Sequence, residues 1–239
     1  SVIRRNFPDD LSQKKHWGQN LATALEIFIP RSELQQGTDH PIIHFGYINW
    51  GYSWVFPNKD EIIIGLGGLN RKNDKRFKEL FKNYIAEIVP SYQPDESQQK
   101  RIYGHPVPSG NYLRNPVYKS IMLVGDAAGF SDTISGEGIF QAQRSAEIAS
   151  LSIYRSLNDG QPLKESYLKL LKKHMFPELF YAKLLRWFIF TALEKLNFNL
   201  IQMLTIRGEK RAIDIIHGLR TYKFMRRSEG IHDGILWGM

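Results

Sequence analysis

The chain has 239 residues, a net charge of +8 and no cysteine. This length allows one large domain or two small ones, and the ordinary apolar and charged fractions exclude a disordered chain. The lack of cysteine excludes disulfides, thiolate nucleophiles and thiolate metal sites, and it fits an intracellular protein. The basic residues are scattered rather than gathered beside a recognisable module, so we do not expect nucleic acid as a partner.

The first half of the chain predicts an antiparallel sheet of three or four strands, covered by a helix. The expected strands are residues 25–30, part of 41–50, 52–56 and 61–66, with turn residues between them. Residues 75–89 then carry apolar side chains at helical spacing, and Pro90 ends this helix. The apolar face of the helix consists of Phe77, Leu80, Phe81, Tyr84, Ile85 and Ile88.

The second half predicts one buried strand and several helices. Residues 101–107 are expected to be extended, 119–124 to form a buried strand and 138–157 a long helix. From Leu163 onward the pattern is mostly helical, with Pro177 as a kink or boundary. Charged residues interrupt the apolar tail before it reaches the roughly 20 residues of a spanning helix. Packing on the main domain, a membrane-surface helix and a tunnel wall all stay open for this tail.

The most specific motif follows the expected strand at 119–124. The string Gly125-Asp126-Ala127-Ala128-Gly129 stands there, and Ser135-Gly136-Glu137-Gly138-Ile139 opens the long helix. An aspartate at the end of a strand can accept hydrogen bonds from a ribose or ribityl hydroxyl. Glycines at a helix start expose N–H groups that suit a pyrophosphate or the electron-rich edge of a flavin. The length of the string favours a ligand site over an ordinary strand–turn–helix with a capping aspartate.

This string resembles the second FAD-contacting motif of the flavoproteins that include p-hydroxybenzoate hydroxylase, and most closely that of the geranylgeranyl reductases. The resemblance implies that Asp126 binds the ribityl chain and that the glycine-rich helix start lies near the flavin ring and pyrophosphate. The residues expected at the cofactor are Gly125, Asp126, Gly136, Glu137, Gly138 and Ile139. Thr133 stands where the family commonly has proline, and this departure is expected to loosen the loop under the flavin.

A second motif is Tyr52-Ser53-Trp54-Val55-Phe56-Pro57, followed after seven residues by Gly65-Leu66-Gly67. Alternation along a strand puts the three aromatic side chains on one face, which could hold a prenyl chain or simply pack on helices. The motif resembles the Tyr-x-Trp-x-Phe-Pro…Gly-x-Gly pattern that lines the substrate cavity of geranylgeranyl reductases. The resemblance implies substrate contacts from Tyr52, Trp54, Phe56, Pro57, Gly65 and Gly67.

The first five residues resemble the end of the Asp-Gly-x-x-Ser-x-x-Arg motif of the same flavoproteins, which implies a cofactor contact from Arg4. The chain has no Gly-x-Gly-x-x-Gly turn, since the candidates at 65–70 and 136–141 fail at the last position. We therefore expect an α+β fold whose amino-terminal dinucleotide-binding fold is missing. The expected parts are 1–5, the end of an FAD-binding segment; 6–118, a substrate-binding antiparallel sheet domain; 119–160, the returning FAD-binding strand and helix; and 161–239, a helical region.

The resemblance implies an FAD-dependent oxidoreductase that reduces C=C bonds of prenyl substrates. Reduced flavin gives a hydride and a proton reaches the neighbouring carbon, with Tyr52 and His105 as the two candidate proton donors. The electron donor would be NAD(P)H or a ferredoxin-like protein. No metal is expected, because Pro41 and the strand pattern spoil a helical pair of His40 and His44. We expect a cytoplasmic location, with peripheral membrane contact as an open alternative.

Two alternatives to the reductase remain. A flavin-dependent monooxygenase or halogenase would share the same scaffold, although the aromatic motif favours the reductase. The chain could also be a truncated, non-catalytic lipid-binding fragment. Without the dinucleotide fold, tight FAD binding should fail, because one half of the cofactor has nothing to hold it, whereas a prenyl-binding fragment would still take up lipid.

Overall fold

The computed structural model describes residues 14–34, 38–73, 76–90, 92, 102–195 and 222. The chain divides into two compact units: Trp17–Val107, here called the sheet unit, and Ser1–His16 with Pro108–Met239, here called the helical unit. A short helix, α3 (Lys14–Gln19), precedes the sheet. The sheet unit falls within the range 6–118 expected for the substrate domain, and the limits of that domain remain a prediction.

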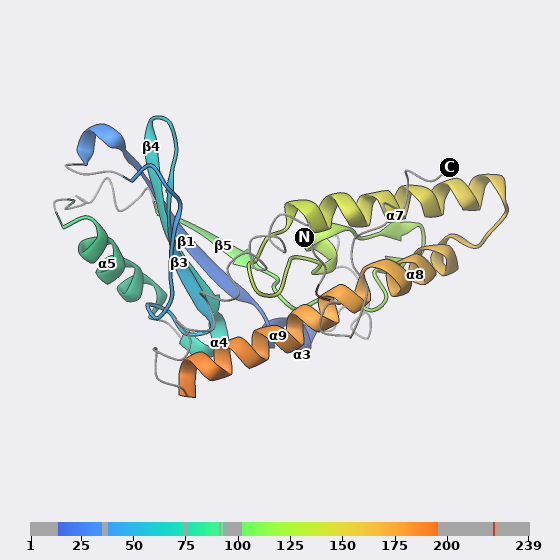
Figure 1. Ribbon diagram of the computed structural model, residues 1–239. Coiled ribbons are helices and arrows are strands. Elements are labelled where there is room, and N and C mark those ends of the chain that lie inside the picture. The colour runs from blue at the N-terminus through green and yellow to red at the C-terminus, as the bar shows by residue number, and fades with distance from the viewer. Residues whose placement is uncertain are drawn as a thin grey trace. The chain divides into compact units, whose positions relative to one another are not determined.

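The sheet unit is built on five antiparallel strands in the order β2-β3-β4-β1-β5 (Figure 1). They are β1 (Ala22–Pro30), β2 (Ile42–His44), β3 (Gly51–Pro57), β4 (Glu61–Leu69) and β5 (Tyr103–Val107), with the short helices η1 (Arg31–Glu33) and α4 (Asn70–Asn73) at strand ends. The predicted antiparallel sheet is confirmed. The segment at 101–107, expected only to be extended, supplies an additional edge strand that pairs with β1.

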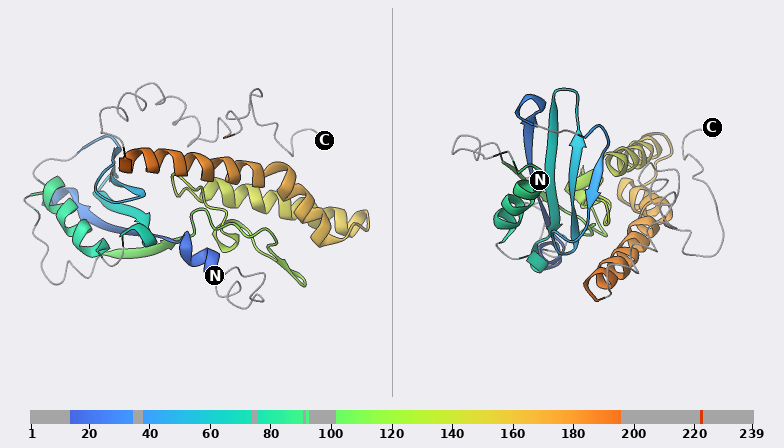
Figure 2. Two further views of the ribbon diagram at one scale, coloured as in Figure 1. Left: turned by 90° about the horizontal axis from the view of Figure 1, so that it is seen from below. Right: turned by 60° about the vertical axis from the view of Figure 1, so that its left-hand side comes forward.

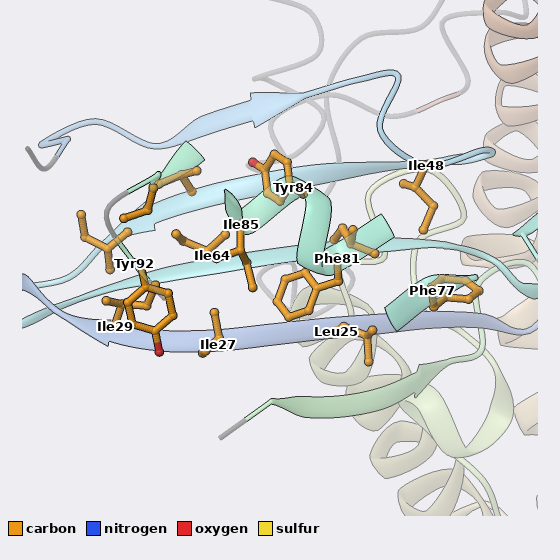
Figure 3. Packing of buried hydrophobic residues seen from close by; sticks show 14 residues of the cluster. Leu25, Ile27, Ile29, Ile48, Ile64, Phe77, Phe81, Tyr84, Ile85 and Tyr92 are labelled. Carbon is orange, nitrogen blue, oxygen red and sulfur yellow. The ribbon is translucent and has the colours of Figure 1, made fainter. Parts of the chain in front are cut away.

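One face of the sheet is covered by α5 (Phe77–Ile88), as Figure 2 shows. Alternation along β1 and β4 points six apolar side chains at this helix, and Figure 3 shows several of them meeting Phe81 and Ile85. These strand residues are Leu25, Ile27, Ile29, Ile62, Ile64 and Leu66. The apolar face predicted for α5 is confirmed, because all six of its residues are buried or partly buried in this core. Burial of each such side chain stabilises the unit by about 1.5–3 kcal/mol.

The helical unit contains the hairpin β6 (Val117–Tyr118) and β7 (Ile121–Met122), the turn η2 (Gly125–Ala128), and the helices α7 (Ile139–Asn158), α8 (Leu163–His174) and α9 (Phe176–Lys195). Helices α7 and α8 lie side by side in Figures 1 and 2. The long helix and the boundary near Pro177 are confirmed. The strand expected over 119–124 is shorter than predicted, because Lys119 has a positive φ of 54° and turns the chain back on itself.

Helix α9 is apolar around most of its circumference. Leu179, Ala182 and Phe190 are buried, whereas Trp187 and Phe188 on the other side are 61% and 59% exposed. None of the helices that the structure describes combines the length and the low charge needed to cross a bilayer. Apart from Tyr222, the helical region predicted beyond residue 195 lies outside the described residues.

Candidate functional site

The turn at Gly125 brings the end of the hairpin against α7. Gly125 is buried with φ +52°, and a Cβ atom there would lie 3.0 Å from the Cβ of Ala142. Its N–H donates to Ser145 Oγ at 2.9 Å, and Ser145 Oγ donates in turn to the carbonyl of Gln141 at 2.8 Å. Glycine is therefore required by both the backbone conformation and the close approach to the helix. The sequence analysis missed Ser145, whose place on the buried side of α7 was the available signal.

The Asp126 carboxylate lies at the start of α7. A Cβ atom on Gly138, the residue that precedes the helix, would stand 2.9 Å from Asp126 Oδ1. Partial burial of the carboxyl raises its pKa. Within the part of the chain that the structure describes, no hydrogen bond to this carboxylate is formed, so its oxygens are available to accept from a ligand hydroxyl. The structure thus brings together Asp126 and Gly138, as predicted from the motif.

The loop between η2 and α7 is held by the buried side chain of Asp132. Its Oδ1 accepts the N–H of Ile134 at 2.9 Å and both the N–H and the hydroxyl of Ser135, at 2.8 and 2.9 Å. The N–H of Gly136, which has φ +71°, donates to the carbonyl of Asp132 at 3.1 Å. This arrangement fixes the loop before any ligand arrives. Asp132 escaped the sequence analysis, although an aspartate before Thr-Ile-Ser-Gly is typical of such turns.

Glu137 caps α7. Its Oε1 accepts the N–H of Phe140 at 2.7 Å, so a carboxylate already stands at the positive end of the helix dipole. A pyrophosphate at this helix start would meet a like charge, whereas an uncharged ring edge would not. Next to the cap, Ile139 is 76% exposed. The helix start therefore fits the ring of a ligand better than its phosphates. Arg4, expected at the same ligand, lies outside the described residues.

A buried arginine ties the loop to α9. Arg186 is 5% exposed, and its Nη1 donates to the carbonyl and Oγ of Ser109, at 3.2 and 3.3 Å, and to the carbonyl of Thr133 at 3.5 Å. Ser109 Oγ itself donates to the Thr133 carbonyl at 2.8 Å. From farther along the chain, Tyr222 makes a side-chain hydrogen bond with Asp132, and burial raises its pKa. The loop that Thr133 was expected to loosen is thus tied down from two directions.

Arg186→Met should lower the free energy of unfolding by about 2–3 kcal/mol, because buried carbonyls lose a charged donor. Urea unfolding followed by circular dichroism measures the loss. Lys173→Met is the matched control, since Lys173 is exposed on α8 and its replacement should change stability little. Equal losses from the two variants would show that the Arg186 hydrogen bonds do not stabilise the loop.

The outer face of the sheet, opposite α5, carries the aromatic motif. Rings of Tyr52 and Trp54 lie 5.8 Å apart, and those of Trp54 and Phe56 stack at 6.1 Å. A Cβ atom on Gly65 would stand 2.2 Å from Cζ2 of Trp54, so the indole lies flat on this glycine. The space at Gly65 is therefore filled by Trp54 itself, and a ligand would meet the indole rather than the bare backbone. The indole also reaches Gly67, where a Cβ would be 3.4 Å from Cζ3.

A hollow of about 470 Å³ lies on the outer face of the sheet, and its size is within the range of small-molecule sites. Its lining residues are Glu26, Phe28, Pro30, Glu61, Tyr103 and His105. His105 and Tyr52 share one row of this face, because Ala24 pairs with both Gly67 and His105 while Tyr52 pairs with Gly67. Three strand spacings separate the two, about 14 Å. Of the two predicted proton donors, the hollow is lined by His105.

The remaining predicted residue of the motif, Pro57, ends β3 opposite Ile62. Glu26 was not predicted, although an acidic residue at an outward position in the apolar strand β1 was a usable signal. Among the residues described, no three His, Asp or Glu side chains are grouped to hold a metal ion.

Comparison with known proteins gives relatives in both sequence and fold. No protein-family model matches the chain. It is 30% identical over 129 residues to digeranylgeranylglycerophospholipid reductase 2 of Methanosphaera stadtmanae, covering 52% of this chain and 32% of the relative. It is 34% identical over 110 residues to geranylgeranyl diphosphate reductase of Synechocystis, covering 46% of this chain and 26% of the relative. The chain therefore spans about a third or less of the length of these two relatives.

The fold also has a solved counterpart. The crystal structure of a geranylgeranyl bacteriochlorophyll reductase-like protein from Thermoplasma acidophilum matches with a TM-score of 0.55 at 22% identity, over 71% of this chain and 43% of that one. The mixed helix and antiparallel-sheet fold is shared with that protein. The chain is thus a homologue of the geranylgeranyl reductases, at about 30% identity over about half of its length.

Proposed function

We propose that the chain forms part of an FAD-dependent oxidoreductase that reduces C=C bonds of prenyl lipids. The observation that carries the proposal is the unpaired acceptor of Asp126 beside Gly138 at the start of α7. A carboxylate there can accept from the ribityl hydroxyls, and the exposed Ile139 offers apolar contact to the ring. The residues present therefore fit the flavin half of FAD. The homologous reductases supply the reaction class.

FAD, when bound and reduced, supplies a hydride to one carbon of the double bond, and a proton must reach the neighbouring carbon. The outer face of the sheet would hold the apolar chain on Trp54 and keep water from it. His105 is the favoured side chain to deliver the proton, because it lines the hollow and Tyr52 does not. Either imidazole nitrogen can carry that proton.

The substrate class comes from the names of the relatives, which act on a digeranylgeranyl glycerophospholipid or on geranylgeranyl diphosphate. The 239-residue chain should therefore be incubated without oxygen with excess FAD, dithionite and a geranylgeranyl substrate. Reductase activity gives products that have gained one H₂ per reduced bond in mass spectra. A product carrying added oxygen or halogen, formed in air, would instead support the monooxygenase or halogenase alternative. Replacing dithionite by NAD(P)H or a reduced ferredoxin identifies the electron donor.

Gly138→Ala should weaken flavin binding about as much as loss of the Asp126 carboxylate does, because the new methyl group displaces Oδ1. Residue 138 has φ −123°, which alanine adopts without strain, so stability should change by less than about 1 kcal/mol. Flavin fluorescence titration and urea unfolding test the two halves of this prediction. Unchanged flavin affinity would place the ligand away from Asp126.

A further inference from the structure

The hollow on the outer face of the sheet has an uneven distribution of charge. Two of its six lining residues are glutamates, and among those six only His105 can carry a positive charge. The two carboxylates stand toward opposite ends, since Glu61 pairs with Pro30 and Glu26 pairs with Gly65. Four residues along the strand separate these pairs, about 13 Å.

Between the two carboxylates the surface is apolar. Phe28 and Tyr103 meet edge to face with ring centroids 5.6 Å apart. Gly65, the partner of Glu26, is covered by the indole of Trp54, so the aromatic motif continues to the edge of the hollow. A hydrocarbon chain can therefore pack along aromatic surface from Trp54 to Phe28.

We propose that this hollow binds the apolar part of a prenyl substrate and rejects its phosphate-bearing head. A phosphate or diphosphate in the hollow would lie near Glu26 and Glu61, and a partly water-excluded wall screens such repulsion poorly. The head group consequently stays outside the hollow, and uncharged prenyl alcohols or hydrocarbon ends are the preferred occupants. This inference rests on the proposed prenyl-lipid function and specifies which part of the substrate contacts this face.

The charge balance of the whole chain makes the inference specific. With a net charge of +8, a general electrostatic effect would favour the anionic ligand. Preference for an uncharged prenyl ligand would therefore have to come from local carboxylates. Glu26 and Glu61 are the two that line the hollow, so their neutralisation should reverse the preference.

The test is a binding titration without flavin, with geranylgeraniol and geranylgeranyl diphosphate each below its micelle concentration. Intrinsic tryptophan fluorescence reports binding, and Trp54→Phe identifies the signal that comes from the aromatic face. The alcohol should bind at least tenfold more tightly than the diphosphate, equivalent to about 1.4 kcal/mol. Glu26→Gln with Glu61→Gln should strengthen diphosphate binding by about tenfold and leave alcohol binding unchanged. Added salt should narrow the difference.

Glu79→Gln is the matched control, because Glu79 is exposed on α5 at the opposite face of the sheet. It should leave the ratio of the two affinities unchanged. The inference is overturned if the diphosphate binds as tightly as the alcohol, if the double variant keeps the original ratio, or if neither ligand binds. Because no flavin is present, these results are independent of the flavin titrations that test the cofactor site.

Discussion

Gly51→Ala should lower the free energy of unfolding of the sheet unit by about 3 kcal/mol or more. A Cβ atom at residue 51 would stand 1.9 Å from the carbonyl oxygen of Gly67 and 2.6 Å from the Cα of Gly68. Both atoms belong to the backbone of β4, so no side chain can turn aside, and β3 and β4 would have to separate. Urea unfolding followed by far-ultraviolet circular dichroism measures the effect.

Gly18→Ala is the control for this variant. Gly18 lies in α3, and a Cβ atom there would have nothing within 4 Å. Alanine in a helix is favoured over glycine by about 0.5–1 kcal/mol, so this change should be neutral or stabilising. A similar loss from both variants would mean that the approach of β3 to β4 at Gly51 does not limit stability.

Asp126→Asn should weaken flavin binding roughly 10- to 100-fold, because the ribityl hydroxyls lose a charged acceptor. The amide keeps the size of the side chain, so the loop and α7 should retain their structure. Titration of flavin fluorescence with each protein gives the affinities. Asp159→Asn, an exposed change after the end of α7, should leave them unaltered. Equal affinity of wild type and Asp126→Asn would remove Asp126 from the cofactor site.

The same variant should change how stability depends on pH. Burial raises the pKa of Asp126 in the folded chain, so the folded state holds this proton more tightly than the unfolded state does. The favourable contribution is complete below the unfolded pKa and is lost as pH rises through the folded pKa. Asn carries no such dependence. Relative to Asp126→Asn, the wild type should therefore become less stable as pH rises from acid toward neutral, as unfolding at several pH values would show.

Local patterns predicted much of the fold. Alternation identified the strands around Ile27 and Ile64, and helical spacing identified the buried face of α5 at Phe81. The glycine-rich string at 125–138 also indicated the turn, the carboxylate and the helix start, which the structure brings together. These features depend on neighbouring residues, so a single sequence contains the information.

Contacts between distant residues could not be predicted in the same way. Pairing of β5 with β1 joins Ala22 to Val107, and no local pattern specifies such a partner. Arg186 lies on an apolar helix that predicts nothing about its hydrogen bonds to Thr133. The indole of Trp54 fills the space over Gly65, although the two glycines of the motif suggested room for a ligand. Register and side-chain orientation decide each of these contacts.

The most direct test of the cofactor site is a fluorescence titration of FMN with the 239-residue chain, repeated with ADP as competitor. Asp126 and the start of α7 would hold the ribityl chain and the ring, and Glu137 disfavours phosphates at that helix start. We therefore expect saturable FMN binding that ADP does not reverse and that Asp126→Asn weakens. Displacement of FMN by ADP, or the absence of saturable binding, would contradict the assignment of the flavin half of the cofactor to this chain.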